Sequence, residues 1–324
     1  MKNHPLEALS EDYLAQKNIS ASTKRSYTFA FRHFIRYLKD NKIECAKTSD
    51  VLRYREEKRM LGQSTYSIHV QISALKGLYH YLRHNQKRLN LPVAYAHDIM
   101  ASVKNERIKP HIKKPILTIK QAKQLILHTK NTRNYIWHYR DHAIMYLMIT
   151  SGLRPYEVIY AKTKDLSIIK GERVLYIRGK GDPGDEFVKI SSGAAHALND
   201  YLKKRRDDNP YLFIAHRHTS VYGHLSRTFF KDMFARVLKD CGLDGLNITP
   251  HCLRHTAATL NLLRGGSLES TKALMRHVKI QSTLIYKDHI DKMCDDSAGQ
   301  MEAFILKEAA SHFYDEFIAC SRFK

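Results

Sequence analysis

The sequence is poor in several features that mark other classes of protein. Its five cysteines are odd in number, scattered, and include no C-x-x-C pair, so neither a disulfide framework nor a thiolate zinc site is expected. The longest apolar run, residues 143–149, is far shorter than the roughly 18 residues that a membrane-spanning helix needs. The first residues lack the apolar core and cleavage site of a secretory signal. We therefore expect a soluble, cytoplasmic protein.

Acidic residues are scarce relative to basic ones. The 324 residues include 54 Lys and Arg against 32 Asp and Glu, a formal net charge of +22. Residues 1–110 contribute +10 and residues 111–324 contribute +12. A membrane-surface anchor or a polybasic tail would concentrate these charges, whereas here they are interleaved with apolar residues. Nucleic acid is therefore the expected partner of both halves of the chain.

Polar breaks and helical periodicity predict the organisation of the chain. At about 100–200 residues per domain, the length favours two domains. Residues 102–115 contain two prolines, five basic residues and little apolar content, which is typical of an extended basic linker. We expect a helical domain over residues 1–103, a linker over 104–116, a second domain over 117–295 and a C-terminal helix within 296–324. The helices predicted most clearly are residues 6–17, 23–39 (capped by Ser22), 51–60, 65–84 (capped by Ser64), 118–129 and 140–150.

A β-hairpin is predicted in the second domain. Residues 174–178 and 186–190 are rich in β-formers and flank the turn at residues 179–184. That turn matches G-x-G-x-x-G, but Pro183 and the strand-like residues after it do not open a helix, as a dinucleotide fingerprint must. Lys180 would lie at the hairpin tip. The expected fold class is mainly α with a small antiparallel β-sheet.

Histidines are frequent, and two of them have metal-ligand spacing. His251 and His255 are four residues apart, so two imidazoles could share a cation on one helix face. The residues between them provide no glutamate base and place the cationic Arg254 where it would repel the metal. We therefore expect no metal and no other cofactor.

A different set of residues forms an ordered constellation. Arg154 precedes Glu157 by three positions, and His251 precedes Arg254 by three. His277 precedes Tyr286 by nine positions. Taken singly, a surface arginine, a structural ion pair or a core histidine would explain each. The four segments, in chain order, are TSGLRPYE (150–157), GKG (179–181), HCLRHTAAT (251–259) and HVKIQSTLIY (277–286).

Together these segments resemble the tyrosine recombinase (phage integrase) family. The motifs cover residues 117–290, and the basic helical region before them is similar to the core-binding domain of that family, a SAM-like DNA-binding domain. One departure is Arg276, because family members commonly have glycine just before this histidine. We therefore expect the backbone and the DNA contacts at that point to differ from those of the family.

The resemblance implies a site-specific DNA recombinase or integrase that joins DNA to protein through a 3′-phosphotyrosyl intermediate. Tyr286 would be the nucleophile, and Lys180 would protonate the departing 5′ oxygen. The groups that would hold the phosphate and move protons are Arg154, Arg254, His251 and His277. Glu157 would orient Arg154, and His255 would brace the site.

The resemblance also implies how the protein works with DNA. We expect a monomer in solution that forms a tetramer on two paired sites of double-stranded DNA and exchanges strands through a Holliday junction, with accessory proteins as further partners. It would act at the nucleoid and would not associate with a membrane. The side chains expected on the phosphates are Lys76, Lys104, Arg107, Lys109, Lys113 and Lys114.

Two alternatives stay open from the sequence. A type IB topoisomerase-like enzyme would use similar catalytic residues but relax DNA as a monomer, and a non-catalytic relative would bind DNA without an adduct. The segment 296–324 presents an apolar side that packs either on its own domain or on a neighbouring subunit. The residues on that side are Met301, Phe304, Ile305, Phe313 and Phe317.

Overall fold

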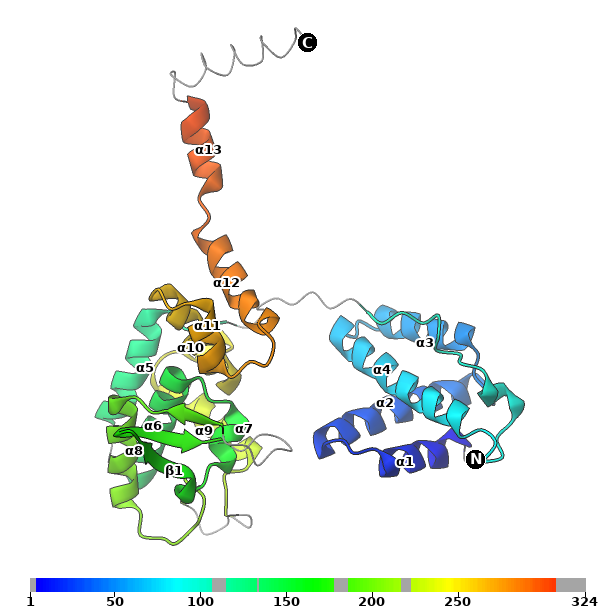
Figure 1. Ribbon diagram of the computed structural model, residues 1–324, viewed down its shortest axis with the longest axis horizontal. Helices are drawn as coiled ribbons and strands as arrows, with labels where there is room; N and C mark the ends of the chain where they lie inside the picture. The colour runs from blue at the N-terminus through cyan, green and yellow to red at the C-terminus, as the bar shows by residue number, and fades with distance from the viewer. Residues whose placement is uncertain (1–3, 107–114, 133, 178–185, 217–222, 307–324) are drawn as a thin grey trace. The chain divides into compact units, whose positions relative to one another are not determined.

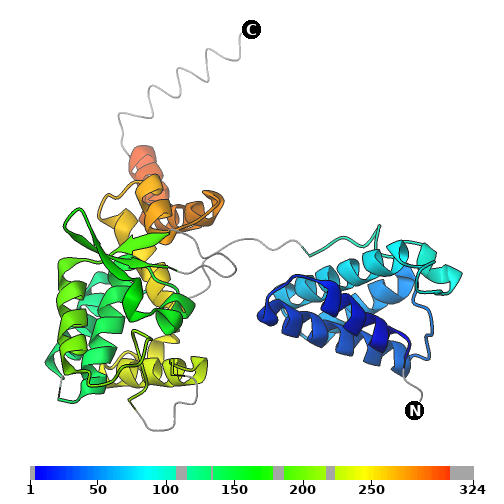
Figure 2. The same cartoon turned by 60° about the horizontal axis from the view of Figure 1, so that its bottom comes forward.

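The computed structural model describes residues 4–106, 115–132, 134–177, 186–216 and 223–306. The chain divides into two compact units, Met1–Pro110 and His111–Lys324, which are coloured in chain order in Figures 1 and 2. The division lies within the segment 104–116 that the sequence predicts as a linker. Each unit has its own hydrophobic core.

The first unit is helical. Its elements are α1 (Leu6–Gln16), α2 (Ala21–Asp40), α3 (Thr48–Met60), α4 (Thr65–His84) and the short 3-10 helix η1 (Val93–Ala96). One face of α4 is buried in its core, with Leu75 and Leu82 fully inaccessible. The predicted cap of α2 was wrong. Ser20, not Ser22, accepts the N–H of Thr23 and starts the helix two residues earlier.

The third helix also begins earlier than the pattern predicts. α3 starts at Thr48 rather than at residue 51, because the Asp50 carboxylate accepts the backbone N–H of Lys47 at 2.8 Å and closes the first turn. At the other end of the unit, Arg55 donates to the carbonyl of Lys104 and Arg59 pairs with Glu106 at 2.6 Å. Residues 104–106 are therefore tied to α3.

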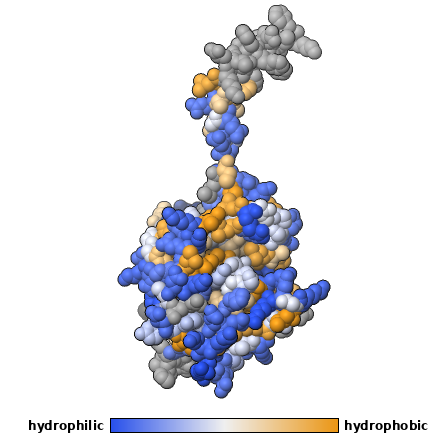
Figure 3. Space-filling view, turned by 90° about the vertical axis from the view of Figure 1, so that its left-hand side faces the viewer, coloured by the Kyte–Doolittle hydropathy of each residue, from blue (hydrophilic) through white to orange (hydrophobic). Residues whose placement is uncertain are grey.

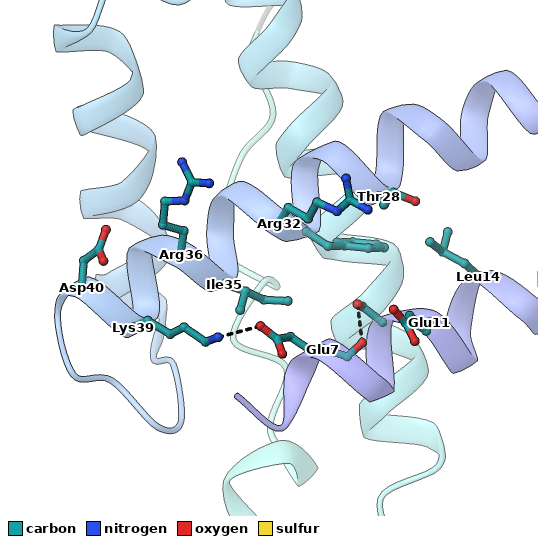
Figure 4. Close-up of a pocket in the computed structure, with 11 residues that line it drawn as sticks. Glu7, Glu11, Leu14, Thr28, Arg32, Ile35, Arg36, Lys39 and Asp40 are labelled. Carbon is teal, nitrogen blue, oxygen red and sulfur yellow. Dashed lines mark hydrogen bonds and ion pairs between the residues drawn. The ribbon is translucent and has the colours of Figure 1, made fainter. Parts of the chain in front are cut away.

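An open groove of about 690 Å³ runs between α1 and α2 (Figure 4). Glu7 and Glu11 lie on its α1 side, and basic side chains including Arg32 and Arg36 lie on its α2 side. The Nζ atom of Lys39 lies 2.7 Å from Oε1 of Glu7 and joins the two helices. The groove is thus a charged surface feature of the first unit, and it contains no predicted catalytic residue.

The second unit is built around α6. Its helices are α5 (Ile119–Asn131), α6 (Ile136–Ser151), α7 (Pro155–Tyr160), α8 (Ser192–Lys204), α9 (Arg227–Asp240), α10 (Pro250–Leu263), α11 (Leu268–Met275), α12 (Gln281–Cys294) and α13 (Ser297–Leu306), with short 3-10 turns η2 (Thr163–Asp165) and η3 (Asp244–Leu246). α6 packs against α5, α8 and α10. It begins four residues before the predicted residue 140, because Nδ1 of His138 accepts the backbone N–H of Tyr135 at 3.2 Å and closes the first turn.

The sheet has three antiparallel strands in the order β1-β2-β3: β1 (Leu166–Ile169), β2 (Glu172–Tyr176) and β3 (Phe187–Lys189). The predicted hairpin is β2 with β3, in which Leu175 is opposite Val188. β1 was not predicted. Its turn to β2 consists of Lys170 and Gly171, both at positive φ, a two-residue turn that is less recognisable than Asn-Gly. The mainly α fold with a small antiparallel sheet is confirmed. The turn that contains Lys180 lies outside the described residues.

The last described helix has apolar side chains that are largely exposed. Met301, Phe304 and Ile305 of α13 are between 49% and 68% exposed. Phe313 and Phe317 lie outside the described residues. Figure 3 shows one mostly hydrophilic face of the second unit, with hydrophobic residues gathered where the C-terminal helices leave it. No helix in the described part of the chain has the length and apolar character required to span a membrane.

Candidate active site

Arg154 and Glu157 meet at the start of α7. α6 ends at Ser151, Gly152 follows in the left-handed conformation, and Pro155 at the first helical position starts α7. The Glu157 carboxylate accepts both the backbone N–H and the Nη1 group of Arg154, each at 2.7 Å. The R-x-x-E spacing therefore caps the helix and orients the guanidinium with the same carboxylate.

Gly152 lies at a point of close approach to α11. Its φ is +61°, and a Cβ there would lie 3.2 Å from the Sδ atom of Met275. Arg254 on α10 joins these two segments, since it donates to the carbonyl of Gly152 at 2.5 Å and to the carbonyl of Met275. Burial, with the charges of Arg154 and Arg276, lowers the pKa of Arg254 to about 9. The group is thus still cationic at neutral pH.

Helix α10 presents three predicted residues on one face, because His251, Arg254 and His255 recur at helical spacing. The rings of His251 and His255 lie 4.8 Å apart. The Nδ1 atom of His255 lies 2.7 Å from the hydroxyl oxygen of Tyr286 on α12. The sequence interpretation gave His255 a bracing role, and the structure shows that it contacts the phenol directly.

Tyr286 is only 4% exposed and packs between α10 and α11 against Ala258 and Met275. Burial raises the pKa of Tyr286 to about 12, although the charges of Arg254 and Arg154 act to lower it. The phenol is therefore neutral at physiological pH, and its use as a nucleophile requires a proton acceptor.

His277 follows α11 and stacks near Tyr286, with ring centroids 6.3 Å apart. Its Nδ1 atom lies 2.9 Å from Oγ1 of Thr283, a fully buried residue that sequence reasoning missed. Thr283 precedes Tyr286 by three positions on α12, and this helical spacing is the signal that could have identified it. Burial and nearby guanidinium groups, that of Arg254 first, lower the pKa of His277 to about 4.

Arg276, the departure from the family pattern, contributes a third guanidinium group to the site. Its side chain is 3% exposed, and Nη2 lies 2.6 Å from Oε2 of Glu157. The sequence marked this position as unusual but assigned it no role. Glu157 is thus a buried carboxylate shared by Arg154 and Arg276.

The structure brings most of the predicted site residues together, both the candidate catalytic residues and the two that would support them. They are Arg154, Glu157, His251, Arg254, His255, His277 and Tyr286, from the start of α7, from α10, from the end of α11 and from α12. Lys180 lies outside the described residues. Of the predicted DNA contacts, Lys76 is half-buried on α4 and Lys104 is exposed after Val103, whereas Arg107, Lys109, Lys113 and Lys114 lie outside the described residues.

The donor set does not fit a metal ion. Among the residues with described positions, no group of three or more His, Cys, Asp or Glu side chains could hold one. The imidazoles of His251 and His255 lie on the same helix as Arg254, whose charge would oppose a cation. The arrangement is suited instead to an anion, because cationic forks surround a single buried carboxylate.

Comparison with known proteins gives this geometry a family. Residues 115–293 match the phage integrase family, and residues 6–86 match the phage integrase N-terminal SAM-like domain. The chain belongs to the phage integrase family. Among its relatives, the tyrosine recombinase XerD of Listeria monocytogenes is 28% identical over 300 residues, which cover 88% of this chain and 95% of that one. The tyrosine recombinase XerA of Pyrococcus furiosus is 29% identical over 275 residues, which cover 85% and 86%.

Solved structures share the fold of this phage integrase. The XerH site-specific recombinase bound to its difH substrate superposes with a TM-score of 0.66 at 17% identity, covering 87% of this chain and 81% of that one. A lambda integrase dimer bound to a core site has a TM-score of 0.62 at 17% identity, covering 85% and 96%. The chain is a site-specific tyrosine recombinase, and neither the topoisomerase nor the non-catalytic alternative is favoured.

Proposed function

We propose that this recombinase cuts and rejoins double-stranded DNA at specific sites through a covalent 3′-phosphotyrosyl link to Tyr286. The observation that supports this most directly is the 2.7 Å contact between the Tyr286 hydroxyl and Nδ1 of His255, with Arg254 and His277 beside it. A phenol in contact with an imidazole and near guanidinium groups is placed for attack on a phosphodiester.

The proposed reaction is a transesterification. The phenol oxygen bonds to phosphorus, and the bond from phosphorus to the 5′ oxygen breaks. The phenolic proton passes to His255, and Lys180 supplies the proton that the 5′ oxygen takes. Because the phosphotyrosine conserves the energy of the broken bond, rejoining needs no ATP.

Arg154 and Arg254, which we call the clamp arginines, would both hold the scissile phosphate. They differ in how many of their N–H donors are available to it. The Arg154 side chain is 40% exposed and makes one side-chain contact with Glu157, so the rest of its fork faces outward. Arg254 is buried and gives two of its five N–H donors to backbone carbonyls. Both would stabilise the charge that develops on the non-bridging oxygens, and His251 and His277 would hydrogen-bond the same group.

The charge of the chain and the exposed face of α13 support a proposal for how the protein assembles on DNA. The net charge of +22, divided between both units, supports binding of duplex DNA by each of them. The uncovered apolar face of α13 supports association of monomers into a tetramer on paired sites, with strand exchange through a Holliday junction. The protein would act on cytoplasmic, nucleoid-associated DNA, with accessory proteins as further partners.

The decisive experiment is covalent capture on DNA. Wild-type protein is incubated with a pool of nicked duplexes that have a randomised centre, and protein-linked DNA is recovered from a denaturing gel and sequenced. Tyr286→Phe, which removes only the hydroxyl, should give no adduct and should bind the recovered duplex as well as the wild type.

Tyr160→Phe is the matched control, because Tyr160 is a half-buried tyrosine of the same unit whose ring packs against Tyr156 and His224. It should form the adduct at the wild-type rate. An adduct that persists in Tyr286→Phe would assign the nucleophile to another tyrosine, and Tyr160 and Tyr314 would be the next to replace.

A further inference from the structure

Arg276 occupies a backbone position that ordinarily favours glycine. It ends α11 with φ +49°, in the left-handed region, and its N–H bonds to the carbonyl of Ala273 at 3.0 Å. A side chain there is strained, because its Cβ approaches the neighbouring carbonyl oxygen. An arginine at this point therefore requires side-chain interactions that compensate for the strain.

The side chain of Arg276 is embedded in the active site. Besides the 2.6 Å ion pair with Glu157, its Nη1 atom lies 3.1 Å from the carbonyl oxygen of Leu274 and 3.4 Å from that of Ser151. Within the described part of the chain, its buried Nε has no hydrogen-bond partner. Burial lowers the pKa of Arg276, the direction expected for a desolvated cation.

Arg276 shares acceptors with both clamp arginines. Oε2 of Glu157 accepts from Nη2 of Arg276 and from the backbone N–H of Arg154, while Oε1 accepts from Nη1 of Arg154. The carbonyl of Gly152, which accepts from Arg254 at 2.5 Å, lies 3.5 Å from Nη2 of Arg276. A change at Arg276 is therefore transmitted to Arg154 through one carboxylate and to Arg254 through one carbonyl.

We propose that Arg276 is a positioning residue for DNA cleavage, which adds to the capping N–H of Arg154 a second donor on Oε2 of Glu157 and so keeps that oxygen from forming a two-point pair with the Arg154 guanidinium. A carboxylate and a guanidinium pair most strongly through two parallel hydrogen bonds. With Oε2 occupied, Arg154 keeps a single side-chain bond, and the rest of its fork is available to the scissile phosphate. The inference rests on the proposed function of Arg154 as a phosphate clamp.

The test measures the rate of adduct formation by three Arg276 variants. The substrate is the duplex that covalent capture with the wild-type protein recovers. Arg276→Gly removes the charge and suits the left-handed backbone, so the protein should stay folded. We expect adduct formation to slow by about tenfold or more, with duplex binding little changed, because a clamp is misplaced rather than lost. Arg276→Met, which keeps the apolar stem and removes the charge, should slow the reaction similarly. Arg276→Lys should restore part of the rate.

Rescue by a second substitution distinguishes positioning from a structural role. Glu157→Gln weakens the pair with Arg154, so adding it to Arg276→Gly should release the fork and raise the adduct rate by about threefold or more over Arg276→Gly alone. In the otherwise wild-type chain, Glu157→Gln should slow the reaction. A merely structural Arg276 predicts a double variant no faster than the single one.

Arg205→Ala is the matched control, because Arg205 is also a buried guanidinium paired with a carboxylate and bonded to carbonyls, at the end of α8. It should lower the melting temperature and leave the adduct rate unchanged. A wild-type rate in Arg276→Gly, or absence of rescue, overturns this inference alone. Failure of the wild-type chain to form a Tyr286 adduct overturns the proposed function and the inference together.

Discussion

Glu157 shows how one residue controls several others in this site. It caps α7, binds the guanidinium of Arg154 and pairs with Arg276, all with one buried carboxylate. The guanidinium groups of the site are held by different numbers of hydrogen bonds. Arg154 stays partly exposed, whereas Arg254 is buried and bonded to two backbone carbonyls. The two clamp arginines should therefore respond differently to substitution.

For Arg154→Ala and Arg254→Ala, we expect cleavage to slow by about a hundredfold or more, the scale on which a transition-state charge donor contributes. Arg154→Ala should leave the melting temperature nearly unchanged, while Arg254→Ala should lower it because two carbonyls lose their donor. Lysine at either position should not restore the full rate, since it lacks the planar fork. Single-turnover adduct formation and thermal unfolding measure both effects, and a normal rate in either alanine variant would remove that arginine from the site.

His216 and His277 should make the stability of the DNA-free protein depend on pH. Burial, first among several causes, lowers the pKa of each from 6.5 to about 4. The unfolded chain then binds protons before the folded one does, so the stability that these groups contribute is complete above pH 6.5 and is lost as the pH falls toward 4. The melting temperature should decline over that range.

His216→Asn should reduce the decline in melting temperature, because one of the two titrating groups is gone, although the hydrogen bond between His216 and the Tyr201 hydroxyl is lost as well. The informative quantity is the slope of melting temperature against pH, not its absolute value. A slope identical to that of the wild type would show that His216 does not titrate as proposed.

At the level of elements, α13 differs from the helices that precede it. Its described residues bury no side chain, whereas α10 buries eight of its 14 residues. Covering an apolar side chain such as Phe304 is worth about 1.5–3 kcal/mol, enough to favour docking on another surface. Since the helix contributes no buried residue to its own unit, docking on a neighbouring subunit is the interpretation that we pursue.

Truncation after Asp296 should therefore leave a folded protein that still binds DNA but has lost cooperative assembly on paired sites. Gel-shift cooperativity and thermal unfolding separate the two interpretations. Packing of this helix on its own unit would instead give a large drop in melting temperature, poor solubility and unchanged cooperativity, and that result would exclude docking in trans without affecting the catalytic assignment.

Across the whole molecule, positive charge dominates. The excess of basic residues is divided between both units, and in the site the guanidinium groups of Arg154, Arg254 and Arg276 outnumber the carboxylate of Glu157. Such a distribution attracts a polyanion and provides locally the charge that a metal ion would otherwise supply to a phosphoryl transfer.

Strand cleavage and rejoining should therefore continue in excess EDTA and without ATP. The assay is recombination of the recovered duplex, with the chelator and the nucleotide varied independently and Tyr286→Phe as the inactive control. Loss of activity on chelation that is restored by an added divalent ion would contradict the guanidinium clamp and favour a metal nuclease.

Much of the local structure could be predicted because its signals are local. Ser64 caps α4 as expected, and the helix predicted from residue 118 is α5, with Thr118 as its N-cap. The failures lie where the local signal is an uncommon one. The first turn of α6 was missed because the imidazole of His138, not a usual capping side chain, accepts the N–H of Tyr135, and β1 was missed because its turn is Lys170-Gly171 rather than Asn-Gly.

The sequence by itself determined the family, because spacings such as Arg154 to Glu157 and His251 to Arg254 are helical neighbours whose geometry is local. Only the tertiary structure decided how these local pieces combine. The bond from Arg254 to Gly152 spans 102 residues, and the pair of Arg276 with Glu157 spans 119. Contacts between distant positions depend on how helices pack, and no local spacing encodes that packing. For that reason Arg276, which the sequence shows only as an irregularity, shares acceptors with Arg154 and Arg254 in the folded chain.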